Sequence, residues 1–234
     1  MNWPPDYKLR RSSRARHPSL RISVRHGLEI VLPMRYSLAN VPGLLQEKRR
    51  WLEKHRQVLE QSVNHSAAPV LPQQIYLAST HEHWKINYWA NANKPQIILR
   101  PQNELIVFGH VDDKKACFQA LNQWVRQRSE EILVPRLHSL SQELNFPFSE
   151  LTIRNQKTRW GSCSAKKSIN LNFKLIFLSP DLVRHIMLHE LCHTIHLNHS
   201  KNFWKLLAKH DPHWEIHHRL SRRNDHPLPF WLDE

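Results

Sequence analysis

The sequence is poor in cysteine and has no long apolar run. Its 234 residues include three cysteines, an odd and sparse number that argues against the disulfide framework of a small secreted protein. No apolar stretch approaches the roughly 20 residues that a membrane-spanning helix needs. The basic residues near the start precede no hydrophobic segment of the secretory type. We therefore expect a cytoplasmic protein with no membrane partner.

Acidic residues are also scarce, with 20 Asp and Glu against 34 Lys and Arg, so the formal net charge is +14. An excess of this size attracts polyanions, including nucleic acid. We expect residues 1–19 to be a basic arm that binds polyanions weakly. No recognisable nucleic-acid-binding motif accompanies the charge, so a solvated surface explains it as well. Seven of the cations fall within the first 25 residues, opposed only by Asp6: Lys8, Arg10, Arg11, Arg14, Arg16, Arg21 and Arg25.

Histidine, in contrast, is abundant, and the stretch HELCHTIHLNH at 189–199 arranges three histidines as metal ligands. On an α-helix, His189 and His193 project from one face one turn apart, so both can bind the same metal ion. Glu190 is adjacent to the first histidine and can reach a water at that metal without being a ligand. His199 follows six residues later and completes a three-histidine set. The pattern predicts a zinc site with one coordination position left for water.

Local signals favour a helix that carries this motif. Ser179 and Pro180 are typical of an N-cap and the first helical residue, and Asp181 suits the positive end of the helix dipole. Asn198 belongs to the residue types that tolerate the left-handed conformation in which helices end. We expect the helix to stop there, so that His199 turns back toward the metal. The nearest downstream acids are alternatives for the third ligand: Asp211 and Glu215.

Sequence patterns in the first half of the chain predict strands and a helix. Alternating apolar residues over 20–25 and 28–33 predict a β-hairpin, and the apolar pattern over 40–63 predicts a helix. The Ser, Ala and Pro of residues 64–72 are typical of a linker. Four short strand patterns then follow, up to Gly109, and they suggest a small antiparallel sheet.

The second half begins with a long helix, expected from Asp112 to about Asn145 and interrupted or bent near Pro135. Strands are expected at 151–155 and 168–173, on either side of a turn. Together these patterns predict an α+β fold.

Two blocks beside the metal motif carry a resemblance to a known family. They are TRWGSCSAKKSINLNFKLIFLSP at 158–180 and NHSKNFWKLLAKHDPHW at 198–214. With HELCH, they resemble the YgjP-like family of zincin-fold metal-dependent hydrolases, which is related to the SprT-like and WLM metalloproteases. The similarity is dense over 150–215 and weaker through the N-terminal half. One departure is Cys192, where relatives more often have alanine or another small residue, and cysteine is small enough to replace it.

The resemblance implies a fold and a set of roles. A zincin-like catalytic domain, with a mixed sheet packed on the HExxH helix, would follow a small, mainly antiparallel β region with helices. We divide the chain accordingly into the arm at 1–19, a β-rich region at 20–110 and the catalytic domain at 111–234. By the same resemblance, the zinc ligands would be His189, His193 and His199, and the catalytic residue would be Glu190.

The RWGSCS block at 159–164 is expected to line the cleft. One strand edge of a zincin-like sheet lies along the cleft, where an extended peptide can pair with unpaired backbone groups. Gly161 would permit a close approach of neighbouring backbone. Arg159 is a candidate for holding a substrate carbonyl, carboxylate or phosphate, although an ion pair with a carboxylate explains it equally well. Trp160 and Cys163 are more simply explained as core residues.

The expected activity is that of a zinc metallopeptidase in which Glu190 acts as general base on a peptide or protein substrate. A zinc-dependent nucleotide hydrolase that cleaves a phosphoanhydride is the alternative within the enzyme class. A third possibility is a nucleic-acid-associated protease or binding module. Glu190 argues against a purely structural metal, which needs no base. Arginines converging near the metal would favour a phosphate substrate, whereas a groove beside a strand edge would favour a peptide.

Overall fold

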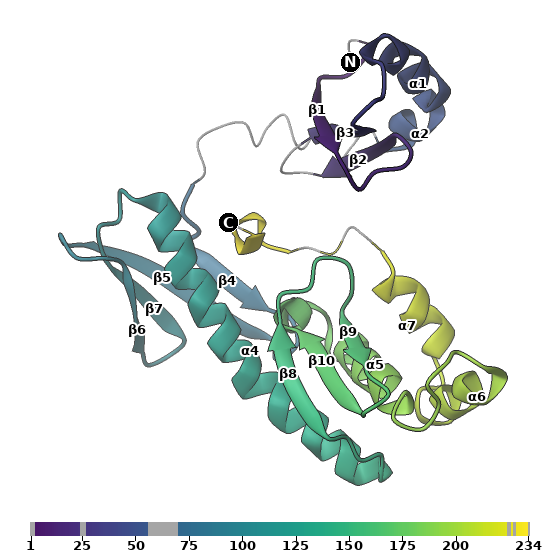
Figure 1. The fold of residues 1–234 in the computed structure, drawn as a ribbon. Helices are drawn as coiled ribbons and strands as arrows, with labels where there is room; N and C mark the ends of the chain where they lie inside the picture. Colours follow the sequence, from purple (N-terminus) through teal and green to yellow (C-terminus); the bar gives the residue numbers. More distant parts are fainter. Residues whose placement is uncertain (1–2, 24–26, 56–69, 224–225, 227, 234) are drawn as a thin grey trace. The chain divides into compact units, whose positions relative to one another are not determined.

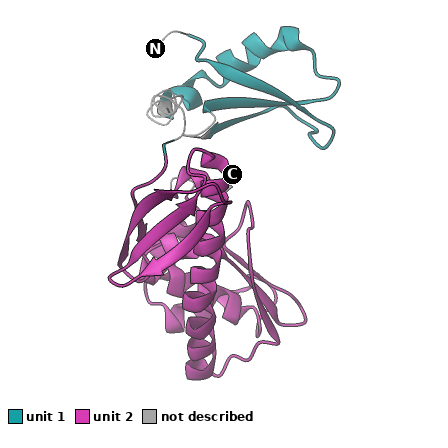
Figure 2. Ribbon diagram, turned by 90° about the vertical axis from the view of Figure 1, so that its left-hand side faces the viewer, with its two compact units in different colours: residues 1–70 teal, residues 71–234 magenta. Residues whose placement is uncertain are grey.

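A computed structural model describes residues 3–23, 27–55, 70–223, 226 and 228–233. The chain divides into two compact units, residues 1–70 and residues 71–234 (Figure 2), and each has its own apolar core. Most of the predicted linker at 64–72 lies outside the described residues. None of the described helices combines the length and apolar character needed to cross a membrane.

The first unit packs two short helices and a three-stranded sheet around a small core. Leu28, Ile30 and Leu32 alternate along one strand, so they share one face of the sheet and pack against Val41, Leu44, Leu45 and Leu52. The predicted hairpin strands are confirmed as an antiparallel pair. Of the helix predicted over 40–63, the structure describes two pieces, and residues 56–63 lie outside the described part. The elements are β1 (Tyr7–Ser12), β2 (Ser19–Ser23), β3 (Gly27–Pro33), η1 (Leu38–Asn40), α1 (Val41–Glu47) and α2 (Arg49–Lys54), and the strand order is β1-β3-β2.

The expected basic arm contains a strand. Residues 7–12 form β1, which pairs in parallel with β3 and places Leu9 opposite Ile30. The prediction that the arm precedes the first strand was therefore wrong. The first five residues of this edge strand are exposed, so its cations stay in solvent while its backbone pairs with β3.

The second unit begins with a four-stranded sheet at the four predicted strand positions. The strands are β4 (Gln74–Leu77), β5 (Glu82–Ala90), β6 (Gln96–Arg100) and β7 (Glu104–Gly109), in the order β4-β5-β7-β6. The sheet is mixed rather than antiparallel as expected, because β5 and β7 pair in parallel while β6 lies on the other side of β7. Alternation in a sequence indicates which face of a strand is buried, but it does not indicate the partner strand.

A long helix, α4 (Lys114–Leu144), joins this sheet to the rest of the unit. Asp113 caps its start by accepting a hydrogen bond from the Ala116 amide, and Asn145 ends it in the left-handed conformation. The helix continues through Pro135, where an interruption or bend was expected, and the buried neighbours Leu133 and Leu137 hold that turn in the core. Side chains of the four-stranded sheet and of α4 belong to one core, so the observed division at residue 70 differs from the expected boundary at 110.

A second, three-stranded sheet and the C-terminal helices complete the unit (Figure 1). In this sheet β8 pairs in parallel with β10, and β9 pairs antiparallel with β10 at the edge. Mixed sheets and helices thus make the fold α+β, with β9 and β10 beside the helix that carries the histidine motif. The elements are β8 (Glu150–Arg154), β9 (Gly161–Cys163), β10 (Ser168–Asn172), η2 (Phe173–Phe177), α5 (Pro180–Cys192), α6 (Lys201–His210), α7 (Trp214–Ser221) and η3 (Phe230–Asp233).

Candidate metal centre

Helix α5 begins where the sequence predicts and ends earlier than expected. The Ser179 hydroxyl accepts a hydrogen bond from the Leu182 amide, and Pro180 is the first helical residue. The helix ends at Cys192 rather than at Asn198, which corrects the predicted stop. The amides of Thr194 and Ile195 donate to carbonyls three residues back, rather than four as in an α-helix, and so form a tighter turn.

This early turn brings the three histidines of the motif together. One ring nitrogen from each of His189, His193 and His199 lies within 4.8 Å of the others, and Nε2 of His199 is 3.0 Å from Nε2 of His189. Nδ1 of His193 is 3.0 Å from the carbonyl oxygen of His196. Hydrogen bonding of one ring nitrogen to a carbonyl is typical of metal-binding histidines and leaves the other nitrogen for the metal. A set of three imidazoles fits a Zn²⁺ ion well.

Aromatic side chains of α6 pack against the rings of these three histidines. Ser200 caps α6, and the fully buried Phe203 ring lies 5.0, 4.6 and 4.8 Å, between centroids, from the rings of His189, His193 and His199. Trp204 is half-buried and stacks on Trp214 of α7, with ring centroids 4.6 Å apart.

Glu190 lies beside this group and is almost entirely buried, with 5% of its surface exposed. Burial raises the pKa of its carboxyl group to about 8, and the nearby Arg159 guanidinium partly opposes that rise. The backbone of Gly161 packs directly against the Glu190 side chain, so a β carbon at position 161 would lie 2.7 Å from Glu190 Oε1. The close approach expected at Gly161 is therefore made with the Glu190 carboxylate rather than with a neighbouring backbone.

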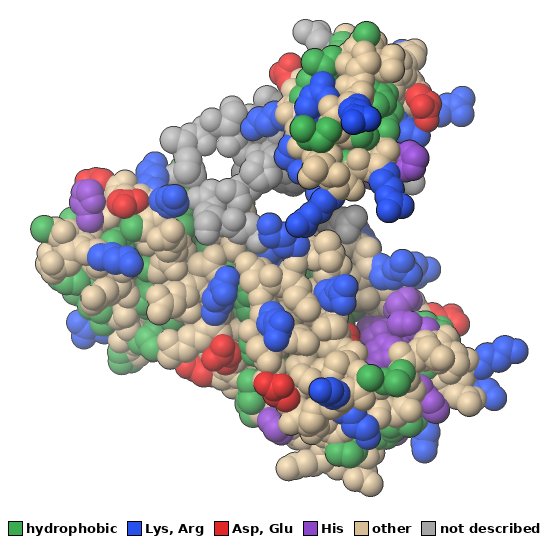
Figure 3. All heavy atoms as spheres, viewed as in Figure 1, with side chains coloured by type: hydrophobic (Ala, Val, Ile, Leu, Met, Phe, Trp, Pro, Cys, Tyr) green, Lys and Arg blue, Asp and Glu red, His purple; other side chains and the backbone are tan. Residues whose placement is uncertain are grey.

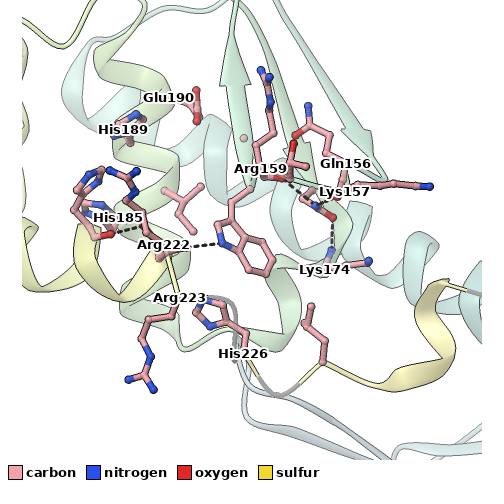
Figure 4. Close-up of a pocket in the computed structure, with 18 of the residues that line it drawn as sticks. Gln156, Lys157, Arg159, Lys174, His185, His189, Glu190, Arg222, Arg223 and His226 are labelled. Atoms are coloured by element: carbon pink, nitrogen blue, oxygen red, sulfur yellow. Dashed lines mark hydrogen bonds between the residues drawn. The ribbon is translucent and has the colours of Figure 1, made fainter. Parts of the chain in front are cut away.

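Two of the three histidines, His189 and His199, line a cavity of about 630 Å³ together with Glu190 (Figure 4). His185, His189 and Glu190 lie on the α5 side, and Arg159 lies on the opposite side with the segment that leads into β9. Asn172 holds this segment by donating to the carbonyl oxygens of Gln156 and Arg159. The only acid on the cavity wall among the described residues is Glu190, whereas five cations line it: Lys157, Arg159, Lys174, Arg222 and Arg223.

The two residues of the RWGSCS block expected in the core are only partly buried, although both pack against it. Trp160 donates its indole N–H to the Ser221 carbonyl at 2.8 Å, which ties the β9 segment to α7. Burial raises the pKa of the Cys163 thiol to about 11.

Asp211 and Glu215, the alternative third ligands, lie elsewhere. Asp211 is buried and lies 2.7 Å from Nδ1 of His185 and 2.9 Å from Nδ1 of His217, so both imidazoles can donate to its carboxylate. Burial raises the pKa of Asp211, and the hydrogen bonds with His217 and His185 outweigh this and lower it. Glu215 is exposed and belongs to none of the metal-binding groups formed by the described residues.

The sequence reasoning missed a second cluster of histidines next to the first. His185, one turn before His189 on α5, comes close to His217 and His218 of α7. Figure 3 shows histidine side chains gathered at the surface over this helix. The four-residue spacing of His185 and His189 was visible in the sequence, but the approach of α7 was not.

A family described as YgjP-like, metallopeptidase domain, matches residues 16–223. No curated protein and no solved structure is similar enough to count as a match.

Proposed function

Because the chain belongs to the YgjP-like metallopeptidase family, and is therefore a metal-dependent, peptidase-like hydrolase, we propose that it is a zinc peptidase centred on His189, Glu190, His193 and His199. The observation that carries this proposal is the convergence of three imidazole nitrogens within 4.8 Å beside a buried carboxylate. All of these residues lie in the proposed catalytic region at 111–234. The packing of α5 beside β9 and β10 supports a zincin-like arrangement.

The proposed ligands are His189, His193 and His199. Zinc bound there would polarise the scissile carbonyl and lower the pKa of a water molecule beside it. Glu190 accepts the proton of that water as the oxygen attacks the carbonyl carbon, and it delivers the proton to the departing amine. The Gly161 backbone, in contact with the Glu190 side chain, fixes the position of this base.

The sheet edge at β9 supports a peptide substrate. β9 is the outer strand in the order β8-β10-β9, and its first residue, Gly161, lines the cavity next to Glu190. An extended peptide can add to such an edge through backbone hydrogen bonds, which places one of its carbonyl groups near the histidines. Arg159, on the opposite side of the cavity from α5, is positioned to bind a carbonyl or carboxylate of that peptide.

One observation favours a second candidate, hydrolysis of a nucleotide phosphoanhydride. Among the described residues, five cations and a single carboxylate line the cavity, which suits an anionic substrate. The cations do not all converge on the histidines, however. In Figure 4 the side chains of Lys157 and Arg223 extend away from His189 and Glu190. A peptide therefore remains the preferred substrate, and an acidic peptide fits the charge of the cavity best.

Substitution of Glu190 tests the proposal. Glu190→Gln keeps the size of the side chain and removes the base, so zinc content and melting temperature stay at wild-type values while hydrolysis falls about 100- to 10,000-fold. Wild type and variant are assayed on a mixed acidic peptide library and on nucleoside triphosphates. Peptide cleavage lost in the variant supports the peptidase, and triphosphate cleavage lost in the variant supports the second candidate. Unchanged hydrolysis by the variant would contradict the role of Glu190.

We also propose that the first unit binds polyanions. Residues 1–70 contain 13 Lys and Arg against 5 Asp and Glu, a net charge of +8 out of the +14 of the chain. In the register of the sheet, Lys8, Arg10 and Arg21 lie on the face opposite the helices, where Glu29 pairs with Arg10 at 2.9 Å. A folded basic sheet face thus replaces the mobile arm as the proposed contact surface.

A further inference from the structure

A second group of ring nitrogens lies in the same cavity. His185 and His189 of α5 and His218 of α7 each offer one ligand atom, and the three atoms lie within 4.8 Å of one another. The ring of His218 lies 6.2 Å from that of His185 and 6.1 Å from that of His189, between centroids. All three residues line the cavity, and Figure 4 shows His185 beside His189 along α5.

His185 is oriented in the way that metal-binding histidines are. It is 1% exposed, and its Nδ1 lies 2.7 Å from the carboxylate of Asp211, which is 4% exposed. A neutral imidazole that donates from Nδ1 to a carboxylate keeps the lone pair of Nε2 for another partner. Because His185 lines the cavity, that partner can come from the cavity.

Asp211 is better explained as a support than as a metal ligand. Its carboxylate oxygens lie at hydrogen-bond distance from both His185 and His217, so these three groups satisfy one another without a cation. Asp211 follows the last residue of α6, and its backbone carbonyl accepts from the Trp214 amide at the start of α7. Asp211 therefore holds α5, which carries His185, against α7, which carries His218.

His218 is held from its other side. Its ring packs edge-on against Trp204 at 5.1 Å, and its backbone carbonyl accepts a hydrogen bond from the Ser221 hydroxyl at 2.9 Å. These contacts keep the imidazole at the cavity wall.

We propose that His185, His218 and Nδ1 of His189 form a second divalent-metal site of the Zn²⁺ or Co²⁺ class. Because Nε2 of His189 lies 3.0 Å from Nε2 of His199, we assign Nδ1 of His189 to the second group. With both metals bound, the His189 ring would bridge them as an imidazolate, and its N–H proton would pass to solvent. The site shares His189 with the proposed zinc centre and rests on the proposed function only through that residue. It binds more weakly than the first, because filling both sites requires the His189 ring to lose its remaining N–H proton. Filling both sites also places two metal cations close together in a cavity where the described lining residues include five other cations.

Metal titration of the metal-free full-length chain tests this site, with Co²⁺ followed by its visible absorption and Zn²⁺ counted by equilibrium dialysis. Wild type binds two equivalents, the second more weakly. His218→Gln, which keeps a polar side chain, loses the second equivalent and retains the first. Asp211→Asn weakens the second equivalent by about 10- to 100-fold, the usual cost of losing the carboxylate behind a histidine ligand. His213→Ala, which removes an exposed histidine next to α7, keeps both equivalents and serves as the control.

Variants of the first centre separate this inference from the proposed function. His199→Ala removes the tighter equivalent and leaves the second, whereas His189→Ala removes both. A single equivalent lost in His199→Ala and unaffected in His218→Gln overturns the second site and leaves the first intact. A single equivalent lost in His218→Gln and kept in His199→Ala supports this site and contradicts the proposed zinc centre. Each variant counts only if its melting temperature stays within a few degrees of that of wild type.

Discussion

The backbone of Gly161 is in direct contact with the carboxylate of Glu190. A β carbon at position 161 would lie 2.7 Å from both Cγ and Oε1 of that side chain, closer than such atoms pack in real proteins. An edge strand and the helix that carries the histidines therefore meet at the carboxyl group that the proposed mechanism uses as its base. Any side chain at position 161 must displace either the strand or the base.

This contact predicts that Gly161→Ala impairs hydrolysis more than it impairs folding. A displacement of the Glu190 carboxylate by about 1 Å lowers the rate about 100-fold, while the histidines keep their positions and their zinc. The measurement is kcat together with zinc content. The matched control is Gly43→Ala in α1, where a β carbon meets nothing within 4 Å. Normal turnover by the Gly161 variant would show that the position of Glu190 does not depend on this contact.

Phe203 is predicted to stabilise both the fold and the metal centre. Its ring is fully buried and lies within 5.0 Å of all three histidine rings, between centroids. Phe203→Ala removes that support and opens a cavity, so the free energy of unfolding falls by about 3–5 kcal/mol. We expect a lower zinc affinity as well, measured by competition with a chromophoric chelator. Leu207→Ala, which opens a cavity at another fully buried position of α6, destabilises the fold but keeps wild-type zinc affinity. An unchanged affinity in Phe203→Ala would contradict the supporting role of Phe203.

The basic sheet face of the first unit is predicted to retain DNA or RNA in a salt-dependent way. Deleting residues 1–17 would remove β1 and disturb the sheet, so point substitutions are the cleaner experiment. Lys8→Glu with Arg21→Glu reverses two charges on that face. Retention on a nucleic-acid column then falls, and its dependence on salt becomes shallower. Zinc content stays unchanged.

The control places the same two charge reversals in the second unit, as Lys114→Glu with Lys115→Glu at the start of α4. Equal loss of retention in both variants would indicate that overall charge, rather than the sheet face, attracts the polyanion.

Local rules predicted those parts of the structure that depend on neighbouring residues. Ser179 and Pro180 begin α5 as predicted, and the strands from Gln74 to Gly109 follow from alternation and turn residues. The end of α5 was missed because Asn198 is only a permissive residue, and the chain leaves the helix at Cys192 through hydrogen bonds that spacing does not reveal.

These local rules could not predict which distant segments pair. The parallel pairing of β5 with β7, and of β1 with β3, depends on how whole elements pack. The same holds for Asp211 and His185, which are 26 residues apart and meet only because α6 brings the chain back to α5. The convergence of the three histidines of one motif could therefore be predicted, whereas the second histidine cluster could not.

Elemental analysis of zinc in the purified protein tests the central claim most directly, with His193→Ala and His196→Ala as a matched pair. The two histidines are three residues apart, but only the ring of His193 belongs to the proposed ligand set, and His196 contributes its backbone carbonyl, which alanine retains. We predict at least one tightly held zinc per chain in wild type and in His196→Ala. In His193→Ala we predict loss of that zinc. Zinc-free wild type with unchanged stability after chelation, or full zinc in His193→Ala, would contradict the account.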